Sequence, residues 1–214
     1  MRRVLLTMHL TLLLVAPGAA QQTGPTAAQS SFAEREIPEL AKLLELQPGM
    51  TAADVGAGFG ACTIELSKVV GASGRVYSTD IGASQLAALR NVAKRDGHAN
   101  VVIESAAAST NLPALCYHAI LIRDAYHHLT DPAAMVKSLA DALKPGGLLA
   151  VIDFPPRTNS EIPSGVPADR LGHGVPIAVL EHEVGAALVH VCTMADWNQI
   201  SQPASLYLVL FRKP

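Results

Sequence analysis

This 214-residue sequence lacks the features that mark nucleic-acid-binding, disulfide-stabilised or membrane-spanning proteins. The charge is nearly balanced, with 16 lysines and arginines against 18 aspartates and glutamates, and there is no basic block. No nucleic-acid partner is therefore predicted, because binding to phosphates needs clustered basic residues. The three cysteines, Cys62, Cys116 and Cys192, have no CxxC spacing, which argues against a disulfide framework or a zinc site. Their apolar surroundings predict buried thiols, with one disulfide in an oxidising compartment as the alternative.

The chain also lacks an apolar run long enough to span a membrane, which takes about 20 residues. The N-terminal apolar run covers residues 4–16, after Arg2 and Arg3 and before the small residues 17–20. This is the layout of a secretory signal peptide over residues 1–20. We expect a periplasmic or secreted protein with no stable membrane span after cleavage. If the leader does not function, the protein is cytoplasmic.

The remaining chain predicts one domain over residues 34–214, preceded by a small, polar and flexible leader over 21–33. Apolar residues at helical spacing predict a helix over 34–46. Short apolar runs then alternate with helical stretches. Strands are expected at 51–55, 75–80, 100–105, 118–124 and 148–154, and helices at 60–70, 84–95 and 132–143. This alternation indicates an α/β fold with a parallel sheet and helices on both faces.

The pattern changes after residue 154. Residues 155–174 are rich in proline, glycine and charge and predict a long loop. A helix over 175–188 and two closing strands, near 189–194 and 206–211, follow it. No internal repeat is visible.

Three glycines, Gly56, Gly58 and Gly60, follow the first expected strand and the acid Asp54. In an open α/β sheet ligands bind beyond the carboxyl ends of the strands, and glycines there let a ligand approach the backbone. The spacing is D-x-G-x-G-x-G, not the G-x-G-x-x-G of dinucleotide sites. The carboxylate would also repel a diphosphate. S-adenosylmethionine, with an ammonium and a sulfonium and no phosphate, suits this turn better than NAD(P), so an NAD(P)-dependent oxidoreductase is a disfavoured alternative.

This turn resembles motif I of the class I S-adenosylmethionine-dependent methyltransferases with a type 11/25-like domain. The stretches "AYHHLTDP" (125–132) and "LKPGGLLAVIDF" (143–154) resemble later segments of that family. The resemblance runs over about 40–154 and more weakly to the C-terminus. It implies a Rossmann-like fold whose seven-stranded sheet is mainly parallel with an antiparallel C-terminal strand, flanked by helices on both faces.

The resemblance also implies cofactor-binding roles. Asp80, which ends the second strand, would accept hydrogen bonds from the ribose hydroxyls, and Ile81 would lie against the adenine. Many relatives carry an acid for the adenine amino group where this chain has Ala108, so backbone N–H groups or the Ser109 hydroxyl would replace it, with Glu104 as another substitute. The full predicted set is Asp54, Gly56, Ala57, Gly58, Gly60, Asp80, Ile81, Ala107, Ala108, Ser109 and Arg123.

Candidate catalytic residues follow the fourth strand. Asp124 would meet the cofactor's ammonium or the acceptor, and His127 and His128 are candidate general bases. Adjacent residues of a strand or helix point to different sides, so at most one histidine needs to face the site. Alternatively, each histidine has only a structural role, in which it caps a helix or packs below the loop.

The fifth strand and the long loop add further polar residues. Asp153 ends the strand at the same edge, and His173 lies in the loop. No H-x-x-x-H or comparable spacing accompanies them, so no metal site is predicted. Arg157 and Arg170 would attract an acidic substrate or remain solvated loop charges.

These observations predict an S-adenosylmethionine-dependent methyltransferase that acts on a small-molecule acceptor by direct displacement. A non-catalytic exported domain that binds S-adenosylmethionine or a nucleoside is the main alternative, because this cofactor is made in the cytosol and the adenine acid is missing. Bacterial exported methyltransferase-like proteins, which this sequence resembles, carry similar leaders. The sequence specifies neither the acceptor nor an oligomeric state.

Overall fold

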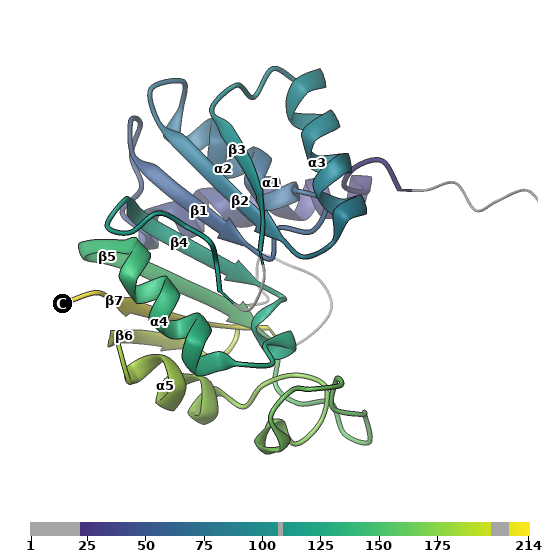
Figure 1. Ribbon diagram of the computed structural model, residues 1–214, viewed down its shortest axis with the longest axis vertical. Helices are drawn as coiled ribbons and strands as arrows, with labels where there is room; N and C mark the ends of the chain where they lie inside the picture. Colours follow the sequence, from purple (N-terminus) through teal and green to yellow (C-terminus); the bar gives the residue numbers. More distant parts are fainter. Residues whose placement is uncertain (1–21, 107–108, 198–205) are drawn as a thin grey trace, which may run out of the picture.

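A computed structural model describes residues 22–106, 109–197 and 206–214 of the chain (Figure 1). The expected signal peptide over 1–20 lies outside these residues. Among the helices within them, none combines the length and apolar character that crossing a membrane requires.

The described elements alternate as the sequence pattern predicts. The strands are β1 (Thr51–Val55), β2 (Arg75–Asp80), β3 (Val101–Ser105), β4 (Tyr117–Arg123), β5 (Leu143–Asp153), β6 (Val189–Met194) and β7 (Tyr207–Arg212). The α-helices are α1 (Ala27–Leu43), α2 (Ala61–Val70), α3 (Ala83–Arg95), α4 (Pro132–Ala142) and α5 (Ile177–Gly185). Two short 3-10 helices are η1 (Tyr126–His128) and η2 (Ala168–Arg170).

The strands form one seven-stranded sheet in the order β3-β2-β1-β4-β5-β7-β6. β1 to β5 pair in parallel, whereas β7 runs antiparallel to β5 and to β6. The predicted mainly parallel sheet with an antiparallel C-terminal strand is therefore confirmed. The strand order reverses between β1 and β4, so the carboxyl ends of these two strands border a crevice where ligands of such folds bind.

Helices cover both faces of the sheet, as predicted. Side chains of a strand alternate between faces, so neighbouring residues of β4 enter different apolar clusters. Leu121 packs with α1 and α2, and Ile120 packs with α4 and α5. In Figure 1, α4 and α5 lie beside the half of the sheet that contains β5, β6 and β7. Both layers leave the carboxyl ends of β1, β2 and β4 accessible.

Helix α1 begins earlier than the sequence pattern predicts. The Thr26 hydroxyl accepts a hydrogen bond from the Gln29 N–H at 3.2 Å, and the Gln29 side chain accepts one from the Thr26 N–H at 2.8 Å. This reciprocal pair is a capping box that starts a helix, and Ala33 in the first turns is fully buried. The prediction of a flexible leader over 21–33 is therefore wrong for residues 27–33.

Other elements differ from prediction mainly at their ends. The fifth strand starts at Leu143 instead of 148, because Leu143 pairs with Tyr117 ahead of an irregularity in the β4–β5 register. The predicted loop over 155–174 contains η2 and an antiparallel bridge between Arg157 and His173. All three cysteines are free. Cys62 is buried as predicted, and the other two are half-buried.

Candidate functional site

The glycine turn after β1 is tied to the end of β2 through Asp80. Asp80 Oδ2 accepts a hydrogen bond from the Gly58 N–H at 2.8 Å, and Oδ1 accepts one from the Gly82 N–H at 2.8 Å. The φ angles of 76°, 53° and 89° at Gly56, Gly58 and Gly60 lie where other residues are strained. A Cβ at Gly60 would collide with the Leu89 side chain, whereas one at Gly58 would meet nothing within 4 Å. Gly60 therefore serves packing, and Gly58 leaves backbone open to a ligand.

A cavity of about 530 Å³ opens at this turn. Its volume falls within the range of small-molecule sites, roughly 300–1,000 Å³. The ends of β1, β2 and β4 all contribute to it, as the reversal of strand order predicts. Among the lining residues are Gly56, Gly58, Asp80, Ile81, Ala106, Asp124, His128 and Met135.

A second cavity of about 170 Å³ shares Gly56, Gly58 and Asp124 with the first. Its other lining residues include Gln29, Phe32, Asp54, Ala57 and Arg123. The first turns of α1, which the sequence analysis places in a flexible leader, thus form part of the site.

The two cavities fit the chemistry of S-adenosylmethionine. Each Asp80 oxygen accepts one N–H and keeps capacity for a further donor, as two ribose hydroxyls require. Ile81 is 81% exposed at the rim of the larger cavity, and a planar base lying on it would remove apolar surface from water. Asp54 and Asp124 give the smaller cavity the negative charge that an ammonium needs.

Asp54 lies beneath the glycine turn and is 2% exposed. Its Oδ2 accepts a hydrogen bond from the Thr63 hydroxyl at 2.6 Å, and that hydroxyl is also 2.8 Å from the Ser78 hydroxyl. Burial raises the pKa of Asp54 to about 6, and the bond from Thr63 offsets only part of this effect. The Asp54 carboxylate is therefore ionised at neutral pH at a cost in free energy.

Arg123 is engaged in a structural network. Its Nε donates to Glu36 Oε2 at 2.7 Å, and its guanidinium lies 3.8 Å from the centre of the Phe32 ring. The buried Glu36 also accepts a hydrogen bond from Trp197 Nε1 at 2.8 Å. Arg123 lines the smaller cavity and also fixes α1 against β4, so its predicted role in cofactor binding stays a prediction. No pattern in the sequence around Glu36 indicates that it pairs with Arg123.

The three predicted catalytic residues occupy different depths. Asp124 has a φ of 55° and is exposed between the two cavities, with its N–H bonded to the Ile152 carbonyl at 2.8 Å. His128 is exposed and lines the larger cavity. His127 is buried, with Nδ1 2.8 Å from Asp153 Oδ1 and its N–H donating to Asp153 Oδ2 at 3.1 Å.

The two adjacent histidines of η1 differ in exposure, but their rings lie close together. Their ring centres are 4.0 Å apart, and the His173 ring lies 4.8 Å from His127 and 5.5 Å from His128. Of the pair, His128 lines the larger cavity and His127 is buried. Burial lowers the pKa of both His128 and His173, and the neighbouring His127 lowers both further.

The predicted adenine-binding residues are only partly described. Ala107 and Ala108 lie outside the described residues. Ala106 lines the larger cavity, and the Ser109 hydroxyl donates to Asn111 Oδ1 at 3.3 Å. Glu104 is exposed on β3. Of this segment, Ala106 therefore lines the cavity, whereas the adenine-binding roles of Ala107, Ala108 and Ser109 stay predictions.

Arg170 has neither of its two predicted roles. It is fully buried, and its Nη2 donates to both Glu183 oxygens at 3.0 and 2.9 Å. Glu183 also accepts a hydrogen bond from the Tyr126 hydroxyl at 2.8 Å. Arg170 therefore holds the long loop against α5 and η1. Arg157 places its guanidinium 4.5 Å from the centre of the Phe154 ring.

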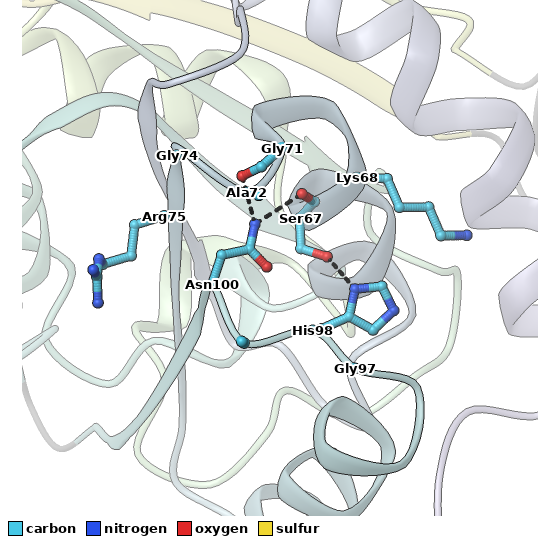
Figure 2. A pocket seen from close by; sticks show the side chains of 10 residues that line it. Ser67, Lys68, Gly71, Ala72, Gly74, Arg75, Gly97, His98 and Asn100 are labelled. Carbon is cyan, nitrogen blue, oxygen red and sulfur yellow. Dashed lines mark hydrogen bonds between the residues drawn. The ribbon is translucent and has the colours of Figure 1, made fainter.

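Another cavity, of about 350 Å³, lies at the opposite ends of β2 and β3 (Figure 2). Asn100 Nδ2 donates to the carbonyls of Ser67 and Gly71, both at 2.9 Å, and His98 Nδ1 lies 2.7 Å from the Ser67 hydroxyl. Figure 2 shows the Lys68 and Arg75 side chains extending away from this group. These polar groups form hydrogen bonds with one another and join the end of α2 to the loop before β3. We therefore assign them a structural role.

Comparisons with known proteins agree with this architecture. Residues 52–147 match the family model described as a methyltransferase domain. The ubiquinone/menaquinone biosynthesis C-methyltransferase UbiE of Shewanella frigidimarina (strain NCIMB 400) is 33% identical over 110 residues, covering 50% of this chain and 44% of that protein. The chain thus spans about half the length of the curated relatives it matches.

Solved structures extend the likeness to most of the fold. A SAM dependent methyltransferase from Aquifex aeolicus matches with a TM-score of 0.66 and 22% identity over 86% of this chain and 93% of that one. Phosphoethanolamine N-methyltransferase 2 from Haemonchus contortus, solved in complex with S-adenosyl-L-methionine, matches with a TM-score of 0.65 and 15% identity over 83% and 52%. These structures establish the shared fold.

The raised pKa of Asp54 predicts a measurable pH dependence of stability. Because the folded-state pKa lies above the unfolded value of 3.8, Asp54 favours the folded state below about pH 4 and loses this contribution as the pH rises through about 6. Asp54→Asn cannot ionise, so its free energy of unfolding should gain about 2 kcal/mol relative to the parent between pH 4.5 and 7.5. Urea unfolding of the ligand-free proteins measures this difference. Glu161→Gln, at an exposed loop carboxylate, is the control, and parallel pH curves for parent and Asp54→Asn would contradict the prediction.

Proposed function

From the premise that this chain carries a methyltransferase domain of the class I S-adenosylmethionine-dependent family, we propose that it transfers a methyl group from this cofactor to a small-molecule acceptor. The observation that carries the proposal is the meeting of two cavities at Gly56, Gly58 and Asp124. One cavity offers Asp80 and Ile81 to an adenosine, and the other offers carboxylates to an ammonium. The sulfonium between these two parts would then lie near their junction.

The chain's own residues would orient the cofactor and accept the proton that the acceptor loses. The bound cofactor supplies an electrophilic methyl group for direct displacement. Asp80 and the glycine turn would fix the cofactor, and the gain from holding two reactants in place reaches roughly 7–11 kcal/mol. Asp124 and His128 both line the larger cavity, where either can accept a proton from an acceptor O–H or N–H. His127 is buried, so its catalytic role would be indirect.

The acceptor would occupy the space beside Asp124 and His128, next to the loop over 155–174. The curated relatives are named C-methyltransferases, which supports a carbon acceptor as one option. That likeness covers only half of the chain. The proposal therefore stops at a small molecule.

A second candidate is an exported domain that binds S-adenosylmethionine without turnover. The absence of an acid in the described residues that follow β3, namely Ala106 and Ser109, favours this reading. An NAD(P)-dependent oxidoreductase stays disfavoured, because the spacing of the three glycines differs from that of dinucleotide sites and because Asp54 lies beside the glycine turn, where it would repel a diphosphate.

Calorimetry with S-adenosylmethionine, S-adenosylhomocysteine and NAD tests the proposal. We expect both sulfur compounds to bind and NAD to give no heat. Formation of S-adenosylhomocysteine across a panel of small acceptors would then establish turnover. Binding without turnover on any acceptor would favour the non-catalytic domain, and binding of NAD alone would overturn both readings.

Ile81 offers a sharper test of the cofactor's orientation than Asp80, because loss of Asp80 would also release the glycine turn. Ile81→Ala should raise the dissociation constant of S-adenosylmethionine roughly tenfold, which corresponds to about 1.4 kcal/mol of lost apolar contact. Its free energy of unfolding should change by less than about 0.5 kcal/mol, since the side chain is exposed. Leu115→Ala, at another exposed apolar residue, is the matched control. Unchanged affinity in Ile81→Ala would show that the adenine lies elsewhere.

Export remains a proposal that rests on the N-terminal sequence. Cleavage after Ala20 would give a mature protein that begins at Gln21. Cell fractionation followed by N-terminal sequencing measures this directly. Recovery of the chain from the cytosol with Met1 at its amino terminus would refute export.

A further inference from the structure

Three histidines that are not predicted as a metal site converge beside the larger cavity. His127 and His128 come from η1, and His173 comes from the long loop. Each offers one ring nitrogen, and these nitrogens all lie within 4.8 Å of one another. With Zn–N distances of about 2.0–2.1 Å, two ligand nitrogens of a tetrahedral zinc ion are about 3.4 Å apart, so the rings would rotate inward to bind a common ion.

The long loop is shaped to bring His173 to this place. The Arg157 N–H donates to the His173 carbonyl at 3.0 Å, and the His173 N–H donates to the Ser160 hydroxyl at 2.8 Å. Gly172 and Gly174 flank His173 with φ angles of 139° and 133°, and a Cβ at either would lie within 3 Å of a backbone carbonyl oxygen. Such a close approach excludes any larger residue. The loop therefore closes back on the end of β5 on both sides of His173.

His127 has the orientation of a metal ligand. Its Nδ1 lies 2.8 Å from Asp153 Oδ1, and both residues are buried. An ionised carboxylate only accepts hydrogen bonds, so Nδ1 carries the proton and Nε2 keeps its lone pair. Histidines that bind metals almost always donate their second ring nitrogen to a carboxylate or carbonyl in this way. The Asp153 carboxylate thus fixes both the ring and its tautomer.

One nitrogen of the His173 ring lacks a hydrogen-bond partner among the described residues. Its Nε2 is buried and makes no hydrogen bond in the described structure. A buried polar nitrogen without a partner costs free energy, roughly 1–3 kcal/mol. Packing of the three rings alone would leave this cost in place, whereas a coordinated ion would remove it.

We propose that His127, His128 and His173 bind one divalent transition-metal ion of the zinc class, with Asp153 as the residue that positions His127. Imidazole nitrogens suit this class of ion. The charge of the ion would be balanced by Asp153 and by Asp124, whose carboxylate lies within 4.8 Å of the ligand atoms of His127 and Asp153. Three protein ligands leave one position open, as in catalytic zinc sites.

The open position would face the larger cavity, which His128 and Asp124 both line. An ion there receives an anionic oxygen or sulfur atom of whatever molecule occupies that space. If the proposed methyl transfer holds, this molecule is the acceptor, and a deprotonated O–H or S–H acceptor is the class the ion selects.

Zinc binding to the untagged, metal-stripped full chain tests the site without any turnover. Calorimetry with Zn²⁺ against a competing chelator should show one ion per chain, and Co²⁺ should give the visible absorption of a nitrogen-ligated ion. His173→Ala and His128→Ala should each lower the affinity at least 100-fold, whereas His182→Ala, which removes an exposed imidazole on α5, should leave it unchanged. Asp153→Asn should lower it 10–100-fold.

The outcome is decisive in both directions. Absence of zinc heat and of a cobalt spectrum in the parent, or equal affinities in the parent, His128→Ala and His173→Ala, would overturn the metal site. Should His173→Ala fail to fold, His128→Ala carries the test, since His128 is exposed and its loss leaves the core intact. A negative result would leave the proposed methyl transfer untouched, because the binding of S-adenosylmethionine is measured separately.

Discussion

The Asp80 carboxylate is the contact on which the geometry of the cofactor edge depends. It accepts N–H groups from two different turns, at Gly58 and at Gly82, and so joins the end of β1 to the end of β2. Hydrogen bonds to an ionised acceptor are stronger than neutral ones, and this pair holds the glycine turn open before any ligand arrives. A turn that is already ordered loses little further entropy on binding, which favours affinity. The same carboxylate adds negative charge above the buried Asp54 and contributes to its raised pKa.

A second carboxylate–nitrogen contact organises the opposite side of the crevice. Asp153, at the end of β5, accepts the His127 N–H and approaches the His127 ring, so it fixes η1 relative to the sheet. The long loop then returns beneath η1, where Arg170 and Tyr126 meet on Glu183. The buried Arg170 guanidinium pairs with Glu183 through Nη2, and removing either partner would leave a costly buried charge. The acceptor side is therefore held by side chains whose partners no local pattern marks, whereas on the cofactor side Asp80 holds turns that their glycines mark in the sequence.

This contrast explains how much of the molecule could be predicted from its sequence. The predicted bounds of β1 and β2 match the structure, because each is a short stretch of strand-compatible residues that lies between glycine-containing turns. The start of α1 differs from the prediction because Thr26 and Gln29 form their capping box within a polar stretch of low periodicity. The partner of Arg123 could not be predicted, since Glu36 reaches it only through the packing of α1 on the sheet. His173 and His128 are 45 positions apart, so no spacing rule joins them.

The two sides of the site are coupled where Gly56 meets Ala125. Asp124 directly follows β4 and has a φ of 55°, a conformation that aspartate tolerates better than most residues. This bend starts η1 and brings the Ala125 methyl group so near the glycine turn that a Cβ at Gly56 would overlap it. Gly56 is therefore required by contact with η1 as well as by its own φ of 76°. A shift of η1 toward the glycine turn would therefore press the Ala125 methyl group against Gly56. The segment that carries the histidines and the turn that lines the cofactor cavity are thus in direct contact, with Asp124 exposed between the two cavities.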